Sequence, residues 1–563
     1  MQKTLILFLI IISQILVAQN PYPQDYFRNP LDIPLVLAGT FAELRSNHFH
    51  SGLDIKTQQR QGLKVYTVAH GHVSRIKISH WGYGKALYIT HPNGYTTVYA
   101  HLQKFSPKIE AYIKKLQYEK ESFEIEVFPK TNELLVDTNE IVAFSGNTGG
   151  SGGPHLHFEI RDKSERPLNP MLFGIDIKDT RKPNIVGVYA YPIEDNAHVN
   201  ESNNKVKLRL IPQNDGNYTV ESINAYGIIG FGINTHDKQD LAANKNGVSK
   251  IQSFYNGNKN FEIDFKRFSF SETKHLNRLI DYAHFKKHKS RIQKLFIQPN
   301  NPLSMYKDVN DNGYIMVEDS TASVYKLRIA DYKGNDVWLS IPISGEKNGN
   351  IKPKHKKITN HFVYANQVTN LEANNISVYI PKDTFYDNFF IDFKAKNDTL
   401  TLHNASIPVK KSMTINFNIS NYTQQDKDKL FIARMTGYKD RLVYSSTAKK
   451  GNIISSRTKT LGTYTLATDI ESPEIKPINF QENKWLSKYR YLKIKLKDNL
   501  SGIKNYRATI NGKWILMEYD AKKSQLVYDF NDNIISETKN NLKLIVTDNV
   551  GNSATFETVF FRK

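Results

Sequence analysis

The sequence of 563 residues contains no cysteine. This absence excludes a disulfide-stapled scaffold, a thiolate zinc site, a cysteine nucleophile and a lipidated N-terminal cysteine. A bound metal ion would have to be held by His, Asp or Glu side chains. The sequence also lacks an arginine-rich helix and any nucleic-acid-binding motif, so we expect no nucleic-acid partner.

Long hydrophobic runs are lacking too, apart from one at the N-terminus. The run from Leu5 to Ala18 follows a single positive charge at Lys3 and is interrupted by two polar residues. It is shorter than the roughly 20 apolar residues of a membrane-spanning helix and resembles a secretory signal. We expect residues 1–18 to be a signal peptide cleaved before Gln19, the alternative being an uncleaved anchor. The mature chain would have no transmembrane segment and would lie in the periplasm, the cell envelope or outside the cell.

Acidic residues are scarce in one part of the chain only. The whole sequence has 76 Lys and Arg against 55 Asp and Glu, a net charge of +21. Residues 20–180 are nearly balanced, with 18 basic and 17 acidic residues, whereas residues 181–563 have 57 basic and 38 acidic residues. The excess is explained either by lysine-rich solvated faces or by an affinity for anionic envelope polymers such as cell-wall glycans.

The period of the apolar residues predicts mostly strands. Residues 63–102 alternate between apolar and polar side chains, with glycines and Asn93-Gly94 between the runs. A period of two predicts twisted antiparallel strands, and Asn-Gly between two such runs predicts a tight hairpin. Further strands are expected near residues 123–128 and 140–144.

One helix is expected within this β-rich part. Ser106 can cap it, Pro107 suits its first position, and apolar residues recur at helical spacing as far as about Glu121. We therefore predict a helical insertion at about residues 107–132.

Beyond Asp179 short β-branched and aromatic runs alternate with Asn, Asp, Gly and Lys turns. This spacing is typical of β-sandwiches, so the fold class is predicted to be dominated by β-structure. Polar stretches at residues 346–357 and 468–473 are predicted linkers. The resulting division is a β-sandwich-like domain at 181–345, another at 358–468 and an immunoglobulin-like domain at 472–563.

Histidines provide the candidate chemistry, in three clusters. They are His50 with Asp54, then His101 in the segment Tyr-Ala-His-Leu, and then His155 with His157. Residues i and i+2 of a strand point to the same side, so His155 and His157 can face one site. His and Asp are ligands that zinc accepts, and three protein ligands with an open fourth position are typical of catalytic zinc.

In this order the motifs resemble the lysostaphin/LytM-like zinc endopeptidases, which cut peptide cross-links of bacterial peptidoglycan. The resemblance covers about residues 30–175 and implies a compact β-rich peptidase domain with a groove over the metal. It implies that Zn²⁺ is bound by His50, Asp54 and His157, and that His101 and His155 are the catalytic pair that does not bind zinc. Which of the two acts as general base is left open.

One departure from the family is visible. The family usually passes quickly from the His-Leu motif to the glycine-rich loop, whereas 54 residues separate His101 from His155 here. The excess is the predicted helical insertion, which we expect to line or restrict the groove.

The sequence therefore predicts an exported zinc endopeptidase acting on peptidoglycan. Two alternatives stay open at this point. One is a catalytically silent module of the same fold that binds cell wall or activates an amidase, and the other is a secreted general protease. In the predicted endopeptidase, the basic region 181–563 would hold the enzyme on anionic envelope polymers.

Overall fold

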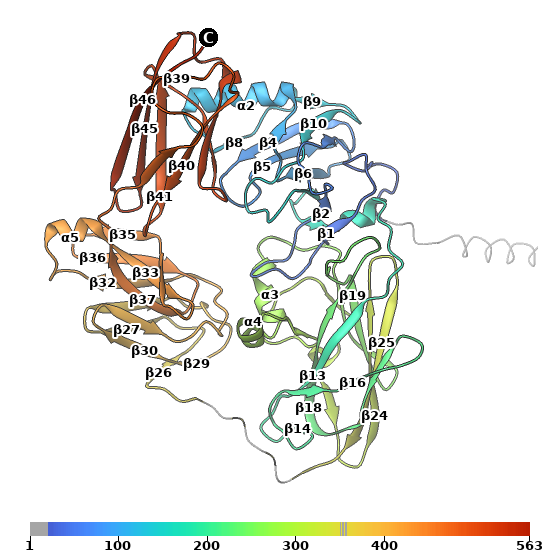
Figure 1. Ribbon diagram of the computed structural model, residues 1–563. Coiled ribbons are helices and arrows are strands. Elements are labelled where there is room, and N and C mark those ends of the chain that lie inside the picture. The colour runs from blue at the N-terminus through green and yellow to red at the C-terminus, as the bar shows by residue number, and fades with distance from the viewer. Residues whose placement is uncertain (1–20, 349–350, 352–353, 355–356) are drawn as a thin grey trace, which may run out of the picture.

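The computed structural model describes residues 21–348, 351, 354 and 357–563. The predicted signal peptide and part of the predicted linker at 346–357 lie outside the described residues. The fold is dominated by β-strands, as predicted (Figure 1). Among the described residues, no helix has the length and hydrophobicity needed to cross a membrane.

The N-terminal region is built on one nine-stranded antiparallel sheet and a smaller sheet of three strands. The large sheet has the order β1 (Leu37–Gly39), β2 (Leu53–Lys56), β11 (His155–Arg161), β6 (Thr96–Ala100), β5 (Lys85–Thr90), β4 (Gly71–Ile78) and β8 (Ile125–Val127), with β12 (Pro167–Leu168) on β11 and β9 (Leu135–Val136) on β4. The small sheet has the order β3 (Lys64–Tyr66), β10 (Ile141–Phe144) and β7 (Lys104–Phe105).

The register of the large sheet brings the histidine motifs together. Strand β11 lies between β2 and β6, and His157 is paired with Asp54 on one side and with Ala100 on the other. The predicted hairpin is present between β5 and β6, where Gly94 adopts a positive φ of 85° in the turn. Segments far apart in the sequence thus meet on adjacent strands.

The predicted helix is α2 (Pro107–Lys120), followed by β8 and β9. The Ser106 side chain makes no capping hydrogen bond, contrary to expectation; the Glu110 carboxylate instead accepts a hydrogen bond from the Phe105 backbone N–H at 2.9 Å. A short helix, η1 (Pro170–Phe173), closes the N-terminal region.

The second region is a network of thirteen hydrogen-bonded strands that shares a hydrophobic core with the N-terminal region. Its strands are β13 (Asn184–Pro192), β14 (His198–Val199), β15 (Val206–Leu208), β16 (Leu210–Pro212), β17 (Tyr218–Val220), β18 (Ile223–His236), β19 (Lys250–Tyr255), β20 (Asn258–Asp264), β21 (Gln293–Lys294), β22 (Tyr306–Lys307), β23 (Ile315–Val317), β24 (Ala322–Ala330) and β25 (Asp336–Gly345). The short helices are η2 (Thr273–His275), α3 (Leu276–Leu279), α4 (Tyr282–His288) and η3 (Asp311–Gly313). Phe41 and Phe49 pack against Phe268, with ring centroids 5.3 and 5.4 Å apart, which joins the two regions.

The third and fourth regions are two-sheet β-structures, each with its own core. The first sheet of the third region has the order β27 (Thr369–Ala373), β28 (Ile376–Ile380), β32 (Met413–Asn418), β36 (Ile453–Thr458) and β35 (Thr447–Lys450). Its second sheet has the order β30 (Phe393–Lys396), β31 (Thr399–Leu402), β37 (Gly462–Thr468), β33 (Leu430–Thr436) and β34 (Arg441–Tyr444). The region also contains the strand pair β26 (His361–Val363) and β29 (Phe389–Ile391) and the helix α5 (Gln424–Lys429). The first sheet of the fourth region has the order β38 (Glu474–Pro477), β40 (Tyr491–Lys497), β44 (Gln525–Asp529) and β43 (Met517–Asp520). Its second sheet has the order β39 (Lys484–Trp485), β46 (Ser553–Phe561), β45 (Lys539–Asp548), β41 (Ile503–Ile510) and β42 (Lys513–Trp514), and a short helix, η4 (Phe530–Asp532), follows β44.

The fourth region returns to the N-terminal region and lies beside α2 (Figure 1). The Tyr118 hydroxyl donates a hydrogen bond to Asp532 at 2.7 Å, and Lys114 pairs with the same carboxylate at 2.5 Å. Helix α2 therefore contacts a distant part of the chain, and in Figure 1 it lies at the end of the N-terminal region away from β1 and β2.

Candidate active site

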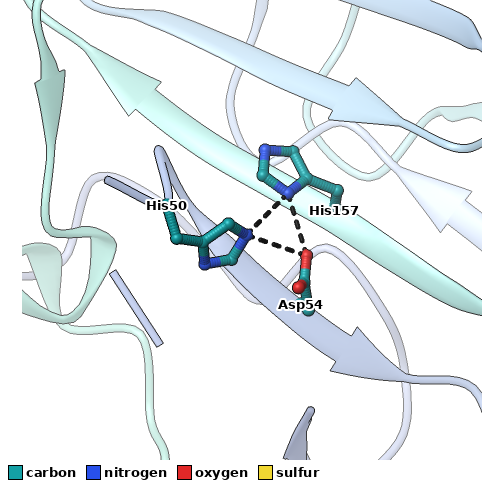
Figure 2. A group of neighbouring side chains, drawn as sticks. All are labelled: His50, Asp54 and His157. Atoms are coloured by element: carbon teal, nitrogen blue, oxygen red, sulfur yellow. Dashed lines mark hydrogen bonds and ion pairs between the residues drawn. The ribbon is translucent and has the colours of Figure 1, made fainter. Parts of the chain in front are cut away.

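His50, Asp54 and His157 come together at one point of the large sheet (Figure 2). His50 Nε2 lies 3.0 Å from Asp54 Oδ1 and 3.1 Å from His157 Nδ1. His157 Nδ1 lies 2.9 Å from Asp54 Oδ1, which closes the triangle. His50 precedes β2, Asp54 lies on β2 and His157 lies on the neighbouring strand β11.

Hydrogen bonds on the far side of each ring fix which nitrogen carries the proton. His50 Nδ1 donates to the Thr40 carbonyl at 2.7 Å. His157 Nε2 donates to Glu159 Oε1 at 2.8 Å. In their neutral forms both rings therefore direct a lone pair toward the Asp54 carboxylate. Burial lowers the pKa of His157, but its hydrogen bonds with Asp54 and Glu159 outweigh burial and raise this pKa to about 9. Without a metal ion a proton on His157 is therefore shared with Asp54, and a bound cation would take the place of that proton.

This donor set fits a metal ion. Tetrahedral zinc holds His and Asp ligands at about 2.0–2.2 Å, so its ligand atoms lie about 3.3 Å from one another. The three observed separations of 2.9 to 3.1 Å are close to that value. The side chains of His50 and His157 are 8% and 4% exposed, so the site is desolvated.

The second oxygen of Asp54 is held separately. Asp54 Oδ2 accepts a hydrogen bond from the Arg45 guanidinium at 3.0 Å, which leaves Oδ1 directed at the two imidazoles. Burial would raise the pKa of Asp54, but the interactions with His50, His155 and His157 together lower this pKa well below its usual value. The carboxylate is therefore ionised and available as a ligand.

Glu159 supports the site from behind and was missed by the sequence analysis. Glu159 Oε1 accepts the hydrogen bond from His157, and Glu159 Oε2 accepts one from the Arg161 guanidinium at 2.7 Å. The Glu159 side chain is fully buried. Burial opposes ionisation of Glu159, but Arg161 and His157 lower its pKa far below normal. The alternation along β11 could have identified Glu159 as a neighbour of His157. Polar side chains occupy alternate positions of this strand, at His155, His157, Glu159 and Arg161.

Tyr83 and Ser51 complete the shell around His157. The Tyr83 ring stacks on the imidazole with centroids 5.2 Å apart, and its hydroxyl donates to Glu159. The Ser51 hydroxyl donates to the same carboxylate oxygen at 2.7 Å. Such outer partners fix the orientation and tautomer of a ligating imidazole.

His101 and His155 lie beside the three-atom cluster, as expected from their motifs. Their ring centroids are 4.8 Å apart, and His155 Nε2 is 3.3 Å from Asp54 Oδ1. His101 Nδ1 donates to the Thr148 carbonyl at 2.9 Å, and His155 Nδ1 donates to the Gly153 carbonyl at the same distance. Each neutral ring therefore has Nε2 as its proton-accepting atom.

The position of His101 requires an uncommon backbone conformation. It follows β6 with a positive φ of 58°, in the left-handed region that non-glycine residues seldom occupy. Burial, together with the neighbouring His157 and His155, lowers the pKa of His101 to about 3. His101 is thus held as a neutral imidazole against the site.

Two models of known families match parts of the chain. Residues 48–118 match the model of peptidase family M23. The N-terminal region is therefore an M23 peptidase domain. A second model, that of the Zu5-like domain, matches residues 360–469 in the third region.

Two curated relatives are similar to about a quarter of the chain. DD-carboxypeptidase/endopeptidase Mpg of Neisseria meningitidis is 34% identical over 132 residues, which are 23% of this chain and 24% of the relative. Peptidoglycan DD-endopeptidase ShyB of Vibrio cholerae is 30% identical over 135 residues, 24% of this chain and 25% of the relative. The chain thus spans about a quarter of the length of these relatives. Among solved structures, a zinc containing peptidase from Vibrio cholerae is 25% identical with a TM-score of 0.21, covering 28% of this chain and 41% of that one.

Proposed function

We propose that the M23 domain is a zinc-dependent endopeptidase that hydrolyses peptide cross-links of bacterial peptidoglycan. The observation that carries this proposal is the convergence of His50 Nε2, Asp54 Oδ1 and His157 Nδ1 beside two further histidines. The donor set of two imidazoles and one carboxylate suits zinc, and its burial suits a site that excludes bulk water. His50, Asp54 and His157 would be the ligands.

The mechanism assigns distinct tasks to the metal and to the protein. When bound, zinc supplies Lewis acidity, which polarises a carbonyl group and lowers the pKa of water to about 7. His101 and His155 both present Nε2 to the site, because Nδ1 of each is engaged with a backbone carbonyl. We assign to this pair the acceptance of a proton from the attacking water and its return to the leaving amine. Between these two transfers the ring holds the proton and donates a hydrogen bond to the developing oxyanion.

The substrate class is inferred from the relatives. Mpg and ShyB are both named for DD-endopeptidase activity. Their likeness to this chain over the peptidase domain supports a bond of the D,D type within a cross-link as the one cleaved.

The test is digestion of purified, cross-linked sacculi by the full-length mature protein. Liberation of monomeric from dimeric muropeptides is expected, with loss of activity after chelation and recovery on adding zinc. His157→Ala serves as the matched inactive protein. No cleavage with zinc present would favour a catalytically silent module that binds cell wall or activates an amidase. Equal cleavage of casein would favour a general protease.

The proposed compartment follows from the substrate and from residues 1–18. Peptidoglycan lies outside the cytoplasm, so the chain must be exported to reach it. Sequencing the N-terminus of the protein recovered from the cell envelope is expected to begin at Gln19. A protein that starts at Met1 and stays with the membrane would instead indicate an uncleaved anchor.

A second proposal concerns the basic region after residue 181. Its 57 basic and 38 acidic residues contrast with the balanced peptidase domain. We propose that this region holds the enzyme on anionic envelope polymers, which raises the local concentration of substrate. Sedimentation of the full-length His157→Ala protein with sacculi should fall about tenfold as salt rises from about 0.1 to 1 M, because the Debye length shrinks from about 10 to 3 Å. Sedimentation that is absent, or indifferent to salt, would contradict the tether.

A further inference from the structure

Three acidic side chains meet at the junction between the peptidase domain and the second region. Asp179 lies in the segment that joins the two, Asp237 directly follows β18, and Asp331 directly follows β24. One carboxylate oxygen of each lies within 4.8 Å of the others. Three separate segments thus bring negative charge to one point.

Two of these carboxylates, Asp237 and Asp331, are buried, whereas Asp179 is half-buried. Asp237 is 2% exposed and Asp331 is 6% exposed. Within the described part of the chain, no ion pair joins any of the three to a Lys, Arg or His side chain. Asp331 accepts hydrogen bonds from the backbone N–H and the side-chain amide of Asn335, at 2.9 and 2.7 Å, which orient it but add no positive charge.

A second observation points to a ligand at this place. Gln239 is 3% exposed, and its carbonyl oxygen Oε1 receives no hydrogen bond from any described residue. The same holds for Asp237 Oδ1. Both side chains line one cavity together with Asp179 and Asp331; it is partly open to solvent and has a volume of about 20 Å³, enough for a single ion or water molecule. Buried acceptors of this kind are costly unless a partner satisfies them.

The electrostatics at the cluster agree with this geometry. Burial, and then the neighbouring Asp179 and Asp331, raise the pKa of Asp237 to about 7. Burial and Asp179 raise the pKa of Asp331 to about 6, although the Asn335 hydrogen bonds oppose the shift. The protein alone therefore disfavours the ionised cluster, and a bound cation would remove that penalty.

We propose that Asp179, Asp237 and Asp331, with the Gln239 carbonyl, form a Ca²⁺ site. The donors are all oxygen atoms, which suits a hard cation and not zinc. Calcium accepts six to eight oxygen ligands in flexible geometry, whereas magnesium demands near-ideal octahedral geometry and retains several waters. Carboxylates contributed by three separate segments, with a cavity open on one side for water, match the calcium pattern.

The site would fasten the peptidase domain to the second region. Thr40 and Phe41 of the peptidase domain line the same cavity. The Thr40 hydroxyl accepts a hydrogen bond from the Gly247 N–H at 3.0 Å, and the Thr40 carbonyl accepts the one from His50 Nδ1. A cation here would thus order a segment that orients a histidine of the candidate active site. The calcium site itself does not depend on the proposed function.

The test is calcium binding to the full-length mature protein, with calcium chloride alone as the probe. Equilibrium dialysis at about 2 mM calcium, above the 10⁻⁴–10⁻³ M range of extracellular sites, should give one fewer ion per chain for Asp237→Asn than for the wild type. Asp176→Asn is the matched control, because Asp176 lies on the same segment with its side chain 86% exposed. Equal calcium content in wild type and Asp237→Asn would overturn the proposal, as would an equal loss in Asp176→Asn.

Measuring the Tm with and without calcium distinguishes loss of the calcium site from poor folding of the variant. Calcium should raise the Tm of the wild type by at least about 3 °C and leave that of Asp237→Asn unchanged. Without calcium, Asp237→Asn should be at least as stable as the wild type, since it removes an uncompensated charge. Gln239→Met, which replaces the side-chain amide with an apolar group of similar length, should weaken calcium binding at least threefold. A Tm rise with magnesium equal to that with calcium, or an unaltered affinity in Gln239→Met, would refute the site as described.

Discussion

The His50–Asp54–His157 cluster and the Asp179–Asp237–Asp331 cluster lie on either side of Thr40, yet they treat a buried carboxylate in opposite ways. Asp54 has its pKa held well below the usual value, and burial is outweighed by three imidazoles. Asp237 has its pKa raised to about 7, because burial is reinforced by two more carboxylates.

The comparison teaches that neighbouring groups decide whether the effect of burial on an acid is opposed or reinforced. Imidazoles that donate a hydrogen bond to Asp54 keep its carboxylate ionised, and the same nitrogens can ligate zinc once they have released that proton. Carboxylates that surround each other need a cation to stay ionised together. The two clusters should therefore differ in the ion they select, nitrogen and oxygen favouring zinc and oxygen alone favouring calcium.

The largest effect is expected from breaking the first cluster at a ligand. His157→Ala removes one of three donors and leaves Asp54 facing a gap, so zinc content should fall to near zero and muropeptide release to background. Asp237→Asn, in the second cluster, should retain the full zinc content. Elemental analysis of both purified proteins checks the contrast. One zinc per chain in His157→Ala would remove His157 from the ligand set.

A somewhat smaller effect is expected at His101. Loss of a general acid–base group typically costs 10²–10⁴-fold, so His101→Ala should lose about that much turnover while keeping zinc. His70→Ala, an exposed histidine of the same domain, is the control and should retain activity. Zinc content and kcat are both measured. Loss of zinc from His101→Ala would make His101 a ligand and contradict the assigned roles.

An intermediate effect is expected at the carboxylate behind His157. Glu159→Gln replaces a charged acceptor with a neutral amide, so the affinity for zinc should fall about 10- to 100-fold, as is usual for such outer partners. Glu165→Gln is a matched control, because Glu165 pairs with the same Arg161 at 3.1 Å but its side chain is 57% exposed. Competition with a chromogenic chelator measures both affinities. Equal affinities would reduce Glu159 to a packing role.

Sequence reasoning could find the first cluster because its three motifs, in their order, resemble those of a known family. The alternation of β11 places His155 and His157 on one side, and the hairpin at Asn93-Gly94 sets the strand that leads to His101. The same alternation contained Glu159, which was overlooked because a buried Glu–Arg pair is not part of any motif. The tautomers could not be predicted, since they depend on the Thr40 and Thr148 carbonyls.

The second cluster could not be predicted in this way. Asp179, Asp237 and Asp331 are 58 and 94 residues apart and obey no spacing rule. They meet only in the folded protein, where the residues that follow β18 and β24 come together with the segment that leaves the peptidase domain. Likewise, the pattern of α2 predicted the helix but not its partner, because Asp532 lies 418 residues from Lys114. Long-range register, which tertiary packing decides, is absent from local periodicity.

The smallest effect is expected at the contact between the fourth region and the loop that leads to His155, beside the first cluster. The Lys522 ammonium donates to the Asn147 side-chain oxygen at 2.9 Å and also to its backbone carbonyl, in the glycine-rich loop that leads to His155. Exposed contacts of this kind contribute about 0.2–1 kcal/mol, so Lys522→Ala should change kcat/KM on a small cross-linked peptide by no more than about fivefold. Lys523→Ala is the matched control, because Lys523 pairs with Asp520 of its own region at 3.0 Å. A large loss in Lys522→Ala alone would mean that the fourth region positions the catalytic loop, whereas identical kinetics in both variants would make this contact incidental.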